Sequence, residues 1–425
     1  MSKISDLIAK LCPNGVEYKS LGELGDFYTG LSGKGKDDFK DGNAKFITYM
    51  NVYSNPGLKV DVEDRVKIAA GERQNTIEKG DVLFTGSSET PDECGMSSVL
   101  LDDPKEPLYL NSFCFGFRMF DKERFEPGFL KHLFRSYELR KQITRTANGV
   151  TRFNVSKVKM AKVNIPVPPL EVQREVVEVL DKFALLTAEL TAELTAELEK
   201  RKKQYEHYRD KLLKFTPPLT EIEIIELGEV IKSLNTGLNP RRFFQLNTDD
   251  AMNYYVTIRE MHGGRIEFSD KTDRINDEAM RLCNNRSNLE KGDVLFSGTG
   301  TIGEMVVLEE TPTNWNIKEG VYTIKPDQTK ILPKFLRYIL MSTPIRLSYL
   351  SKVAGGTVKS ISMGDMKKIK IPLPTLEKQA EVVALLDKFD KLCNDLTSGL
   401  PAEIAARKKQ YEYYRDKLLN FKRVA

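Results

Sequence analysis

An internal repeat constrains this chain more than any other feature, because repeated sequence implies repeated structure. Residues 201–213 (RKKQYEHYRDKLL) return 206 positions later as residues 407–419 (RKKQYEYYRDKLL), with twelve of thirteen positions identical. The motif EKGDVLF at residues 78–84 returns at residues 290–296, displaced by 212 positions. The sequence therefore predicts a pseudo-two-fold repeat. The same arrangement of structural elements, here called the frame, occurs twice, and the segments between its elements differ in length.

Each copy ends in a segment with the pattern of a long helix. Residues 171–213 contain neither proline nor glycine and repeat apolar residues every three or four positions, which predicts a helix of about 43 residues and about 64 Å. The second such segment, from about Leu376 to Phe421, carries Gly399 and Pro401, so a break or kink is expected there. Amphipathic helices of this length need a partner. We expect the two helices to pack antiparallel as a coiled coil.

The remainder of each copy has short strand patterns between turns. Residues 81–84 and 293–296 follow Lys-Gly turns, and Phe113, Phe115 and Phe117 alternate as in a half-buried strand. These strand patterns do not alternate regularly with helices, so a doubly wound sheet is not indicated. The fold class predicted is α/β in the broad sense (α+β), with two globular domains.

Helix patterns also occur within the globular parts. Apolar spacing predicts a helix from about Pro127 to Ile143, and its counterpart, around Lys334 to Leu340, is cut short by Pro344. The four predicted segments are a globular domain at 1–168, a helix at 169–215, a globular domain at 216–374 and a helix at 375–425.

Composition excludes several classes of protein. The chain has 425 residues, which at about 150 residues per domain predicts two or three domains. Lys and Arg number 65 against 61 Asp and Glu, so net charge alone argues only weakly for a polyanionic partner. Five dispersed cysteines favour a reducing cytosol over a disulfide framework. Without an apolar run near 18 residues, the chain is expected to be soluble and cytoplasmic, with no membrane partner.

Taken together, these motifs resemble the specificity subunit of type I restriction–modification enzymes. The resemblance rests on the two L-D-K-F helices (residues 180–183 and 386–389), the LCPNGVEY start (residues 11–18) and the G-D-V-L-F-[ST]-G strands. The tandem Thr-Ala-Glu-Leu tract at residues 187–198 resembles a tract of variable copy number in one branch of that family. The resemblance covers the whole chain.

The resemblance implies a subunit without catalysis of its own. Each globular domain would be a target recognition domain for one half of a bipartite, asymmetric site in double-stranded DNA. The helices would fix the spacer between the halves and dock two modification subunits, which bind S-adenosylmethionine and methylate adenine. Motor–nuclease restriction subunits, which use ATP and Mg²⁺, would join the same complex. No cofactor or metal is expected on this chain itself.

DNA recognition requires Lys and Arg for phosphates, and Arg and polar side chains for base edges. Basic residues recur near glycine-containing loops in both copies, and these are the DNA-binding candidates: Lys34, Lys36, Arg145, Arg152, Arg241, Arg242, Lys352 and Lys359. For any one of them, an ordinary solvated surface charge is the simpler interpretation. The spacer tract is represented by Thr187, Leu190, Thr191, Leu194, Thr195 and Leu198.

Two other functions remain as alternatives. Phe296–Gly303 matches the glycine pattern of a methyl-donor loop, which would make the chain a catalytic adenine methyltransferase, although residues 304–309 predict a strand and not a helix. A coiled-coil adaptor without a DNA role is the second alternative. Asp92, Asp103 and Lys105 fit a loose nuclease pattern that often arises by chance. The three histidines, His132, His207 and His262, have no metal-site spacing. No catalytic residue is therefore predicted.

Overall fold

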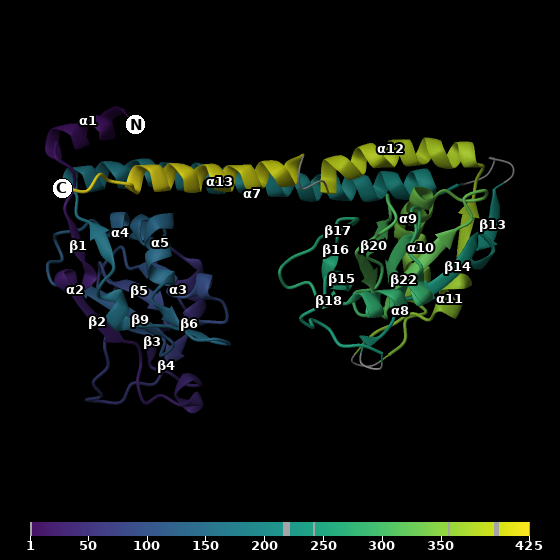
Figure 1. Cartoon of the computed structure of the whole chain (residues 1–425). Coiled ribbons are helices and arrows are strands. Elements are labelled where there is room, and N and C mark those ends of the chain that lie inside the picture. Colours follow the sequence, from purple (N-terminus) through teal and green to yellow (C-terminus); the bar gives the residue numbers. More distant parts are fainter. Residues whose placement is uncertain (1, 216–221, 241–242, 356–357, 395–398, 425) are drawn as a thin grey trace. The chain divides into compact units, whose positions relative to one another are not determined.

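The computed structural model describes residues 2–215, 222–240, 243–355, 358–394 and 399–424 (Figure 1). The chain divides into two compact units, residues 1–191 with 406–425, and residues 192–405. Each unit combines a globular domain of mixed helices and strands with part of the long helices, which confirms the predicted fold class. Among the described residues no helix is long and apolar enough to cross a membrane.

The first unit is built on a four-stranded antiparallel sheet. Its elements are α1 (Ser2–Leu11), β1 (Tyr18–Ser20), α2 (Leu21–Leu24), β2 (Gly25–Thr29), η1 (Lys36–Phe39), β3 (Ala44–Ile47), α3 (Tyr49–Ser54), β4 (Arg65–Val66), β5 (Val82–Thr85), β6 (Ser87–Ser88), η2 (Pro91–Glu93), β7 (Ser97–Val99), β8 (Leu108–Leu110), β9 (Cys114–Met119), α4 (Pro127–Leu133), α5 (Tyr137–Thr144), β10 (Ala147–Asn148), β11 (Phe153–Val155), α6 (Lys157–Met160) and β12 (Asn164–Pro166). The larger sheet has the order β2-β9-β5-β7. Smaller sheets have the orders β4-β3-β8, β10-β11-β6 and β1-β12.

The second unit repeats this frame. Its elements are β13 (Glu223–Glu226), η3 (Leu227–Glu229), β14 (Ile231–Thr236), β15 (Asn253–Val256), η5 (Ile258–Glu260), β16 (Met261–His262), β17 (Arg265–Ile266), β18 (Arg274–Ile275), α8 (Asp277–Ser287), β19 (Val294–Ser297), β20 (Met305–Val307), β21 (Trp315–Ile317), β22 (Val321–Pro326), α9 (Pro333–Met341), α10 (Thr343–Leu350), α11 (Met363–Lys367) and β23 (Lys370–Leu373). The larger sheet has the order β14-β22-β19-β20, which matches β2-β9-β5-β7 strand for strand.

The smaller sheets match as well. In each unit one sheet of three strands contains a single parallel pair, β3 with β8 in the first unit and β15 with β21 in the second. The clearest difference is α8, an 11-residue helix between β18 and β19. The first unit has irregular chain between the corresponding strands β4 and β5. The frame is therefore constant and its contents vary, as the repeat predicts.

The long helices pack antiparallel within each unit. α7 (Leu170–Leu213) is continuous over 44 residues, while the second helical segment consists of α12 (Leu376–Asn394) and α13 (Leu400–Leu419). In the first unit the rings of Phe183 and Tyr414 lie 5.5 Å apart, and Figure 1 shows α13 alongside α7. In the second unit Tyr208 stacks on Phe389 of α12 at 6.2 Å. The predicted break is confirmed, with Gly399 at φ +80°.

The expectation of one helix from Pro127 to Ile143 is wrong. The structure has two helices, α4 and α5, because the backbone of Ser136 is extended (φ −70°, ψ 152°). The Ser136 hydroxyl donates a hydrogen bond to the Leu133 carbonyl. Ser342 repeats this contact with Ile339 at 2.6 Å between α9 and α10. Each copy thus has the same corner between two helices. Pro344 lies in the first turn of α10, directly after the end of α9.

Candidate nucleic-acid interface

An exposed hairpin of the first unit lies next to the end of the central strand β5. β10 and β11 pair antiparallel, and β11 also pairs with β6, which follows β5 directly. The turn requires glycine at position 149, where φ is +141°. A Cβ at Gly149 would lie 2.0 Å from the carbonyl oxygen of Arg152. The hairpin is thus held at its base to β6, and it exposes residues 148–152.

The second unit has the same hairpin against the same strand. Ala354 forms a bridge with Ser360, and Ser360 forms a second bridge with Thr299, just after β19. Gly355 takes the place of Gly149, with φ +120° and a Cβ position 2.3 Å from the Val358 carbonyl oxygen. This register aligns Val358, rather than Lys359, with the Arg152 position of the first unit. Among the described residues, the two loops therefore share their bridges and the conformation of one glycine, and they differ in exposed side chains.

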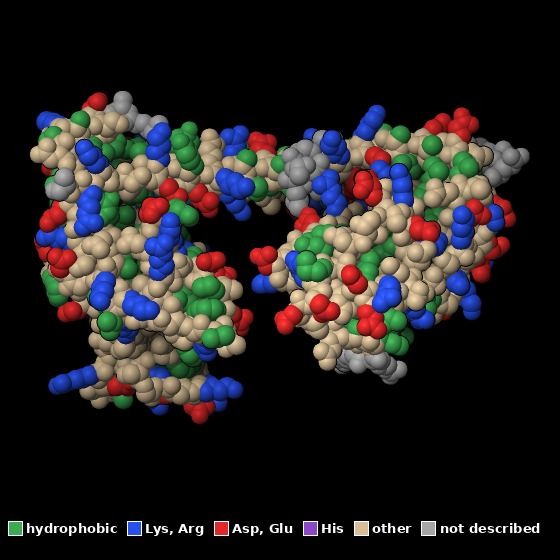
Figure 2. Space-filling model, viewed as in Figure 1, with side chains coloured by type: hydrophobic (Ala, Val, Ile, Leu, Met, Phe, Trp, Pro, Cys, Tyr) green, Lys and Arg blue, Asp and Glu red, His purple; other side chains and the backbone are tan. Residues whose placement is uncertain are grey.

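The structure separates the four candidates of the first unit. Lys34 is only 8% exposed and pairs with Glu72 at 2.6 Å, and this bond is the main reason why the pKa of Glu72 falls to about 2. Lys34 is thus already neutralised. Lys36 is exposed at the start of η1, and Arg145 is exposed at the C-terminal end of α5. Arg152 is exposed on the hairpin. Figure 2 shows Lys and Arg side chains over the end of this unit near β4.

In the second unit Lys352 and Lys359 are exposed on either side of the hairpin. The Lys359 carbonyl accepts a hydrogen bond from the Gly300 amide at 2.9 Å, which ties the hairpin to the turn after β19. Arg241 and Arg242 lie outside the described residues. The structure thus brings Lys352 and Lys359 to one loop and leaves the other two unassigned.

The sequence did not predict that two apolar side chains are exposed near the β10–β11 hairpin. Phe113 was expected in a half-buried strand, but β9 starts at Cys114 and the Phe113 side chain is 58% exposed. Its amide donates to the Asn111 Oδ1 in a turn, and Asn111 in this position was the available signal. Val150, at the turn, is 90% exposed. Both apolar side chains therefore lie on the surface beside or near Arg152.

The methyl-donor alternative gains no support from the Phe296–Gly303 segment. β19 ends at Ser297 and β20 starts at Met305 as its antiparallel partner, so the segment is the predicted strand–turn–strand. The Ser297 hydroxyl closes the turn by donating to the Thr301 carbonyl at 2.6 Å. A Cβ at Gly303 would lie 2.5 Å from the Tyr349 hydroxyl, so packing accounts for this glycine. No described helix begins at this turn.

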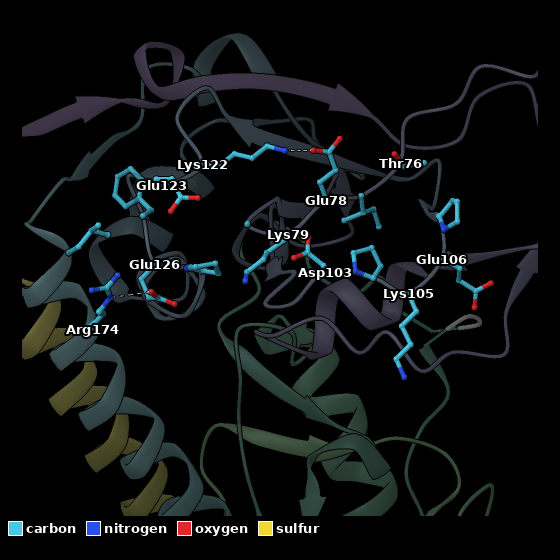
Figure 3. A pocket seen from close by; sticks show the side chains of 17 residues that line it. Thr76, Glu78, Lys79, Asp103, Lys105, Glu106, Lys122, Glu123, Glu126 and Arg174 are labelled. Carbon is cyan, nitrogen blue, oxygen red and sulfur yellow. Dashed lines mark hydrogen bonds and ion pairs between the residues drawn. The ribbon is translucent and has the colours of Figure 1, made fainter.

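The loose nuclease pattern does not form one site. Asp103 and Lys105 line an open pocket beside α4, whose lining does not include Asp92 (Figure 3). Four other charged residues of this pocket form pairs, Lys122 with Glu78 and Arg174 with Glu126, as Figure 3 shows. Among the residues that the structure describes, no group of three His, Cys, Asp or Glu side chains could hold a metal ion.

The histidines also have structural surroundings. His132 is 4% exposed, and its Nε2 lies 2.6 Å from Asp181 of α7. Its Nδ1 lies 3.3 Å from the Tyr411 hydroxyl of α13. His207 packs edge-on against Tyr208 on α7, and His262 is exposed in β16. His132 therefore joins the globular domain to both helices of its unit.

The spacer tract lies inside α7 without interruption, as its helix-forming residues predict. Leu190, Leu194 and Leu198 are each half-buried along it. Thr187 and Thr191 are half-buried and Thr195 is exposed. The leucines, together with Thr187 and Thr191, thus form the half-buried side of this stretch of helix.

Comparisons with known proteins agree on one family. The sequence profile described as "Type I restriction modification DNA specificity domain" matches the chain twice, at residues 13–200 and 220–406. A Haemophilus influenzae protein named as a type I restriction enzyme specificity subunit is 35% identical over 285 residues. The EcoR124I/EcoR124II specificity subunit of Escherichia coli is 34% identical over 275 residues. These matches cover 64% and 63% of this chain and 68% and 65% of the relatives, about two thirds of their length.

A solved structure has the same fold. One chain of the structure described as "Structural basis underlying complex assembly and conformational transition of the type I R-M system" has a TM-score of 0.62 at 20% identity. The alignment covers 96% of this chain and 98% of that chain. Since the family profile covers both copies of the repeat, the chain belongs to the family of type I restriction–modification DNA specificity subunits.

Proposed function

We propose that this chain selects the DNA sequence on which a type I restriction–modification complex acts. Each globular domain recognises one half of a bipartite, asymmetric site in double-stranded DNA. The observation that carries the proposal is the pair of equivalent loops, which place Gly149 and Gly355 in matching conformations but expose Arg152 in the first unit and Val358 in the second. A constant frame with different exposed side chains suits two different half-sites.

The partners follow from family membership. Two modification subunits bind S-adenosylmethionine and methylate adenine, and motor–nuclease restriction subunits supply ATP-dependent cleavage with Mg²⁺. The complex acts on DNA in the cytoplasm. α7 leaves Leu185 and Leu186 59% and 63% exposed, and an exposed apolar stretch of this kind supports the docking of a protein partner on the helices.

The chain itself contributes recognition and no catalysis, and it carries no cofactor or metal. The close approach of Gly303 to Tyr349 supports a packing role for the turn at Phe296–Gly303 rather than the binding of a methyl donor. The purified chain without partners is expected neither to methylate nor to cut DNA. Turnover that copurifies with this chain alone, and that disappears when Gly298 and Gly300 are replaced, would restore the enzyme alternative.

The spacer between the half-sites depends on α7. The Thr-Ala-Glu-Leu tract adds length to this helix in units of four residues, so it can act as the ruler between the two recognition domains. Support comes from the uninterrupted helix through the tract and from the packed leucines along it.

Methylome mapping tests the proposal as a whole. The chain is co-expressed with the modification subunit of the same genome in a host without other adenine methylation, and methylated adenines are mapped. We expect one bipartite motif that appears only when both proteins are present. Methylation at unrelated sites, or the same motif without this chain, would contradict the proposal and favour the adaptor alternative.

A further inference from the structure

Arg152 differs from Lys36 and Arg145, the other exposed DNA-binding candidates of the first unit, because the structure gives contacts that hold its guanidinium. Its Nε and Nη2 donate hydrogen bonds to the Ser87 hydroxyl at 3.3 and 3.0 Å. Its guanidinium carbon lies 5.7 Å from the ring centroid of Phe113. Bonds and a ring contact of this kind fix the plane of a guanidinium. Arg152 is thus oriented before any partner binds.

The anchor of Arg152 is itself rigid. Ser87 is 7% exposed and lies in β6, which pairs with β11. Its carbonyl accepts a hydrogen bond from the Tyr49 hydroxyl at 2.8 Å. Ser87 therefore lies within this small sheet, and Arg152 directly precedes its strand β11. A side chain held by such supports keeps its direction when it meets a ligand.

The anchoring uses only one edge of the guanidinium. An arginine has five N–H donors, and the Ser87 contact engages the side formed by Nε and Nη2. The structure records no partner for Nη1 of Arg152 among the described residues. The end formed by Nη1 and the second Nη2 hydrogen is therefore available as a two-pronged donor, which is the geometry that matches O6 and N7 of guanine in the major groove.

The side chains around Arg152 favour contact with the edge of a DNA base over contact with a phosphate. Phe113 beside Arg152 is 58% exposed and Val150 on the same hairpin is 90% exposed. Figure 2 shows hydrophobic side chains at the surface of this unit near α3 and β6. Apolar side chains contact base edges such as the thymine methyl group, whereas a phosphate contact requires neither them nor a fixed guanidinium plane. Arg145, exposed at the end of α5, has the character of a phosphate contact.

We propose that Arg152 determines specificity in the first recognition domain by donating two hydrogen bonds to a guanine of the first half-site. This inference rests on the proposed function and names the base class at one position. The second domain has Val358, 60% exposed, in the equivalent position, so this contact is absent from the second half-site. The asymmetry of the DNA site then has one defined source in the protein.

The test uses the full chain co-expressed with its modification subunit, with methylome mapping and methylation of synthetic duplexes. Arg152→Lys keeps the charge and removes the two-pronged donor, so one G·C position of the first half-site should accept other bases. Discrimination there should fall about 10- to 100-fold. Arg145→Gln is the matched control, which should lower methylation of all sites without altering the motif.

The outcomes separate this inference from the function on which it rests. An unchanged first half-site in Arg152→Lys and Arg152→Gln overturns the inference while the proposed function stands. A relaxed position that is A·T in the wild-type motif also overturns it. A wild-type chain that directs no bipartite motif overturns the proposed function and the inference together. Equal melting temperatures of the wild type and both Arg152 variants confirm that a changed motif is not a folding defect.

Discussion

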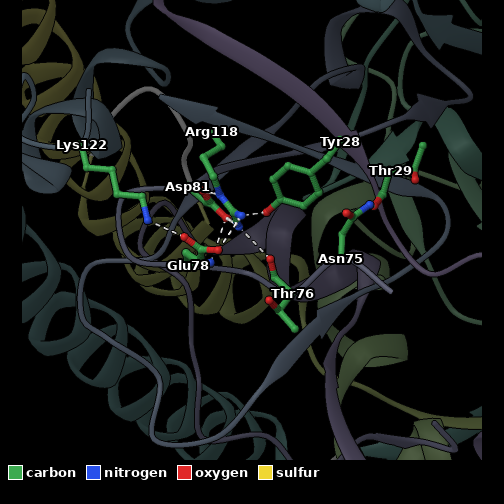
Figure 4. Close-up of polar contacts among 8 residues, drawn as sticks. All are labelled: Tyr28, Thr29, Asn75, Thr76, Glu78, Asp81, Arg118 and Lys122. Atoms are coloured by element: carbon green, nitrogen blue, oxygen red, sulfur yellow. Dashed lines mark hydrogen bonds and ion pairs between the residues drawn. The ribbon is translucent and has the colours of Figure 1, made fainter. Parts of the chain in front are cut away.

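Arg118 of β9 forms two hydrogen bonds with the Asp81 carboxylate, from Nε at 2.9 Å and from Nη2 at 2.6 Å (Figure 4). Asp81 is 1% exposed and also accepts a bond from the Tyr28 hydroxyl at 2.7 Å. The same Asp81 bond is the main reason why the pKa of Arg118 is raised. In the second unit, Lys325 contacts Asp293 at 2.8 Å in the same place. The aspartate of the repeated E-K-G-D motif thus forms an ion pair with a basic residue of the neighbouring strand in each unit.

Removing this carboxylate should destabilise the first unit. Asp81→Asn leaves Arg118 partly buried without its main partner, which should cost about 3 kcal/mol of unfolding free energy. Arg118→Lys is the matched control, because the second unit has lysine at this position, and it should cost roughly 1 kcal/mol. Hydrogen exchange of β5 and β9 amides in the full chain localises the effect. Equal costs for the two variants would contradict this account.

The burial of His132 should make the first unit sensitive to acid. Burial is the main cause that lowers the His132 pKa below 6.5. Burial also acts to raise the pKa of Asp181, but bonds from His132 and Lys131 outweigh it and lower that pKa to about 2. The neutral histidine thus contributes stability above pH 6.5 that is lost as the pH falls toward its folded pKa. The Asp181 contribution is lost only as the pH falls from 3.8 to about 2.

The second unit suggests a substitution that tests the effect of the His132 charge alone. Tyr338 replaces His132 there and donates to Asp387 at 2.6 Å. His132→Tyr should therefore keep the contact with the helix and reduce the loss of melting temperature between pH 7 and pH 5. Melting curves of the wild type and the variant across this range provide the measurement. Parallel curves for the two proteins would show that His132 does not contribute.

Deleting one unit of the tract should shorten the DNA spacer. Removal of residues 191–194 shortens α7 by about 6 Å and rotates the C-terminal part of the helix by roughly 40°. The rotation is small, so the leucine side of the helix still packs and the protein should fold. Since DNA rises about 3.4 Å per base pair, the spacer should shorten by one or at most two base pairs. Methylome mapping measures the spacer, and an unchanged spacer would mean that the tract is not the ruler.

The helices could be predicted from sequence almost to the residue, while the corner between α4 and α5 could not. The prediction for α7 began at residue 171 and the helix begins at Leu170, because no proline or glycine interrupts its pattern. Residues 127–143 have an equally good apolar pattern. Their break depends on the extended backbone at Ser136, which apolar spacing does not record.

The candidate site depends on contacts between residues distant in sequence. Lys34 and Arg152 looked alike as basic residues near glycines. Lys34 is neutralised by Glu72, 38 positions away, and Arg152 is oriented by Ser87, 65 positions away. A sequence pattern shows residue types within one segment, so it indicates candidate arginines and lysines. It does not show which of these side chains is oriented by a residue distant in the sequence.

The two recognition domains should act independently of one another, and a domain exchange measures this independence. Residues 20–160 are replaced by the equivalent segment of another member of the family, the hybrid is co-expressed with the modification subunit, and methylated adenines are mapped. Because each unit has its own frame and core, the first half-site should change while the second half-site stays as in the wild type. A second half-site that changes together with the first, or a first half-site that remains unchanged, would contradict the account.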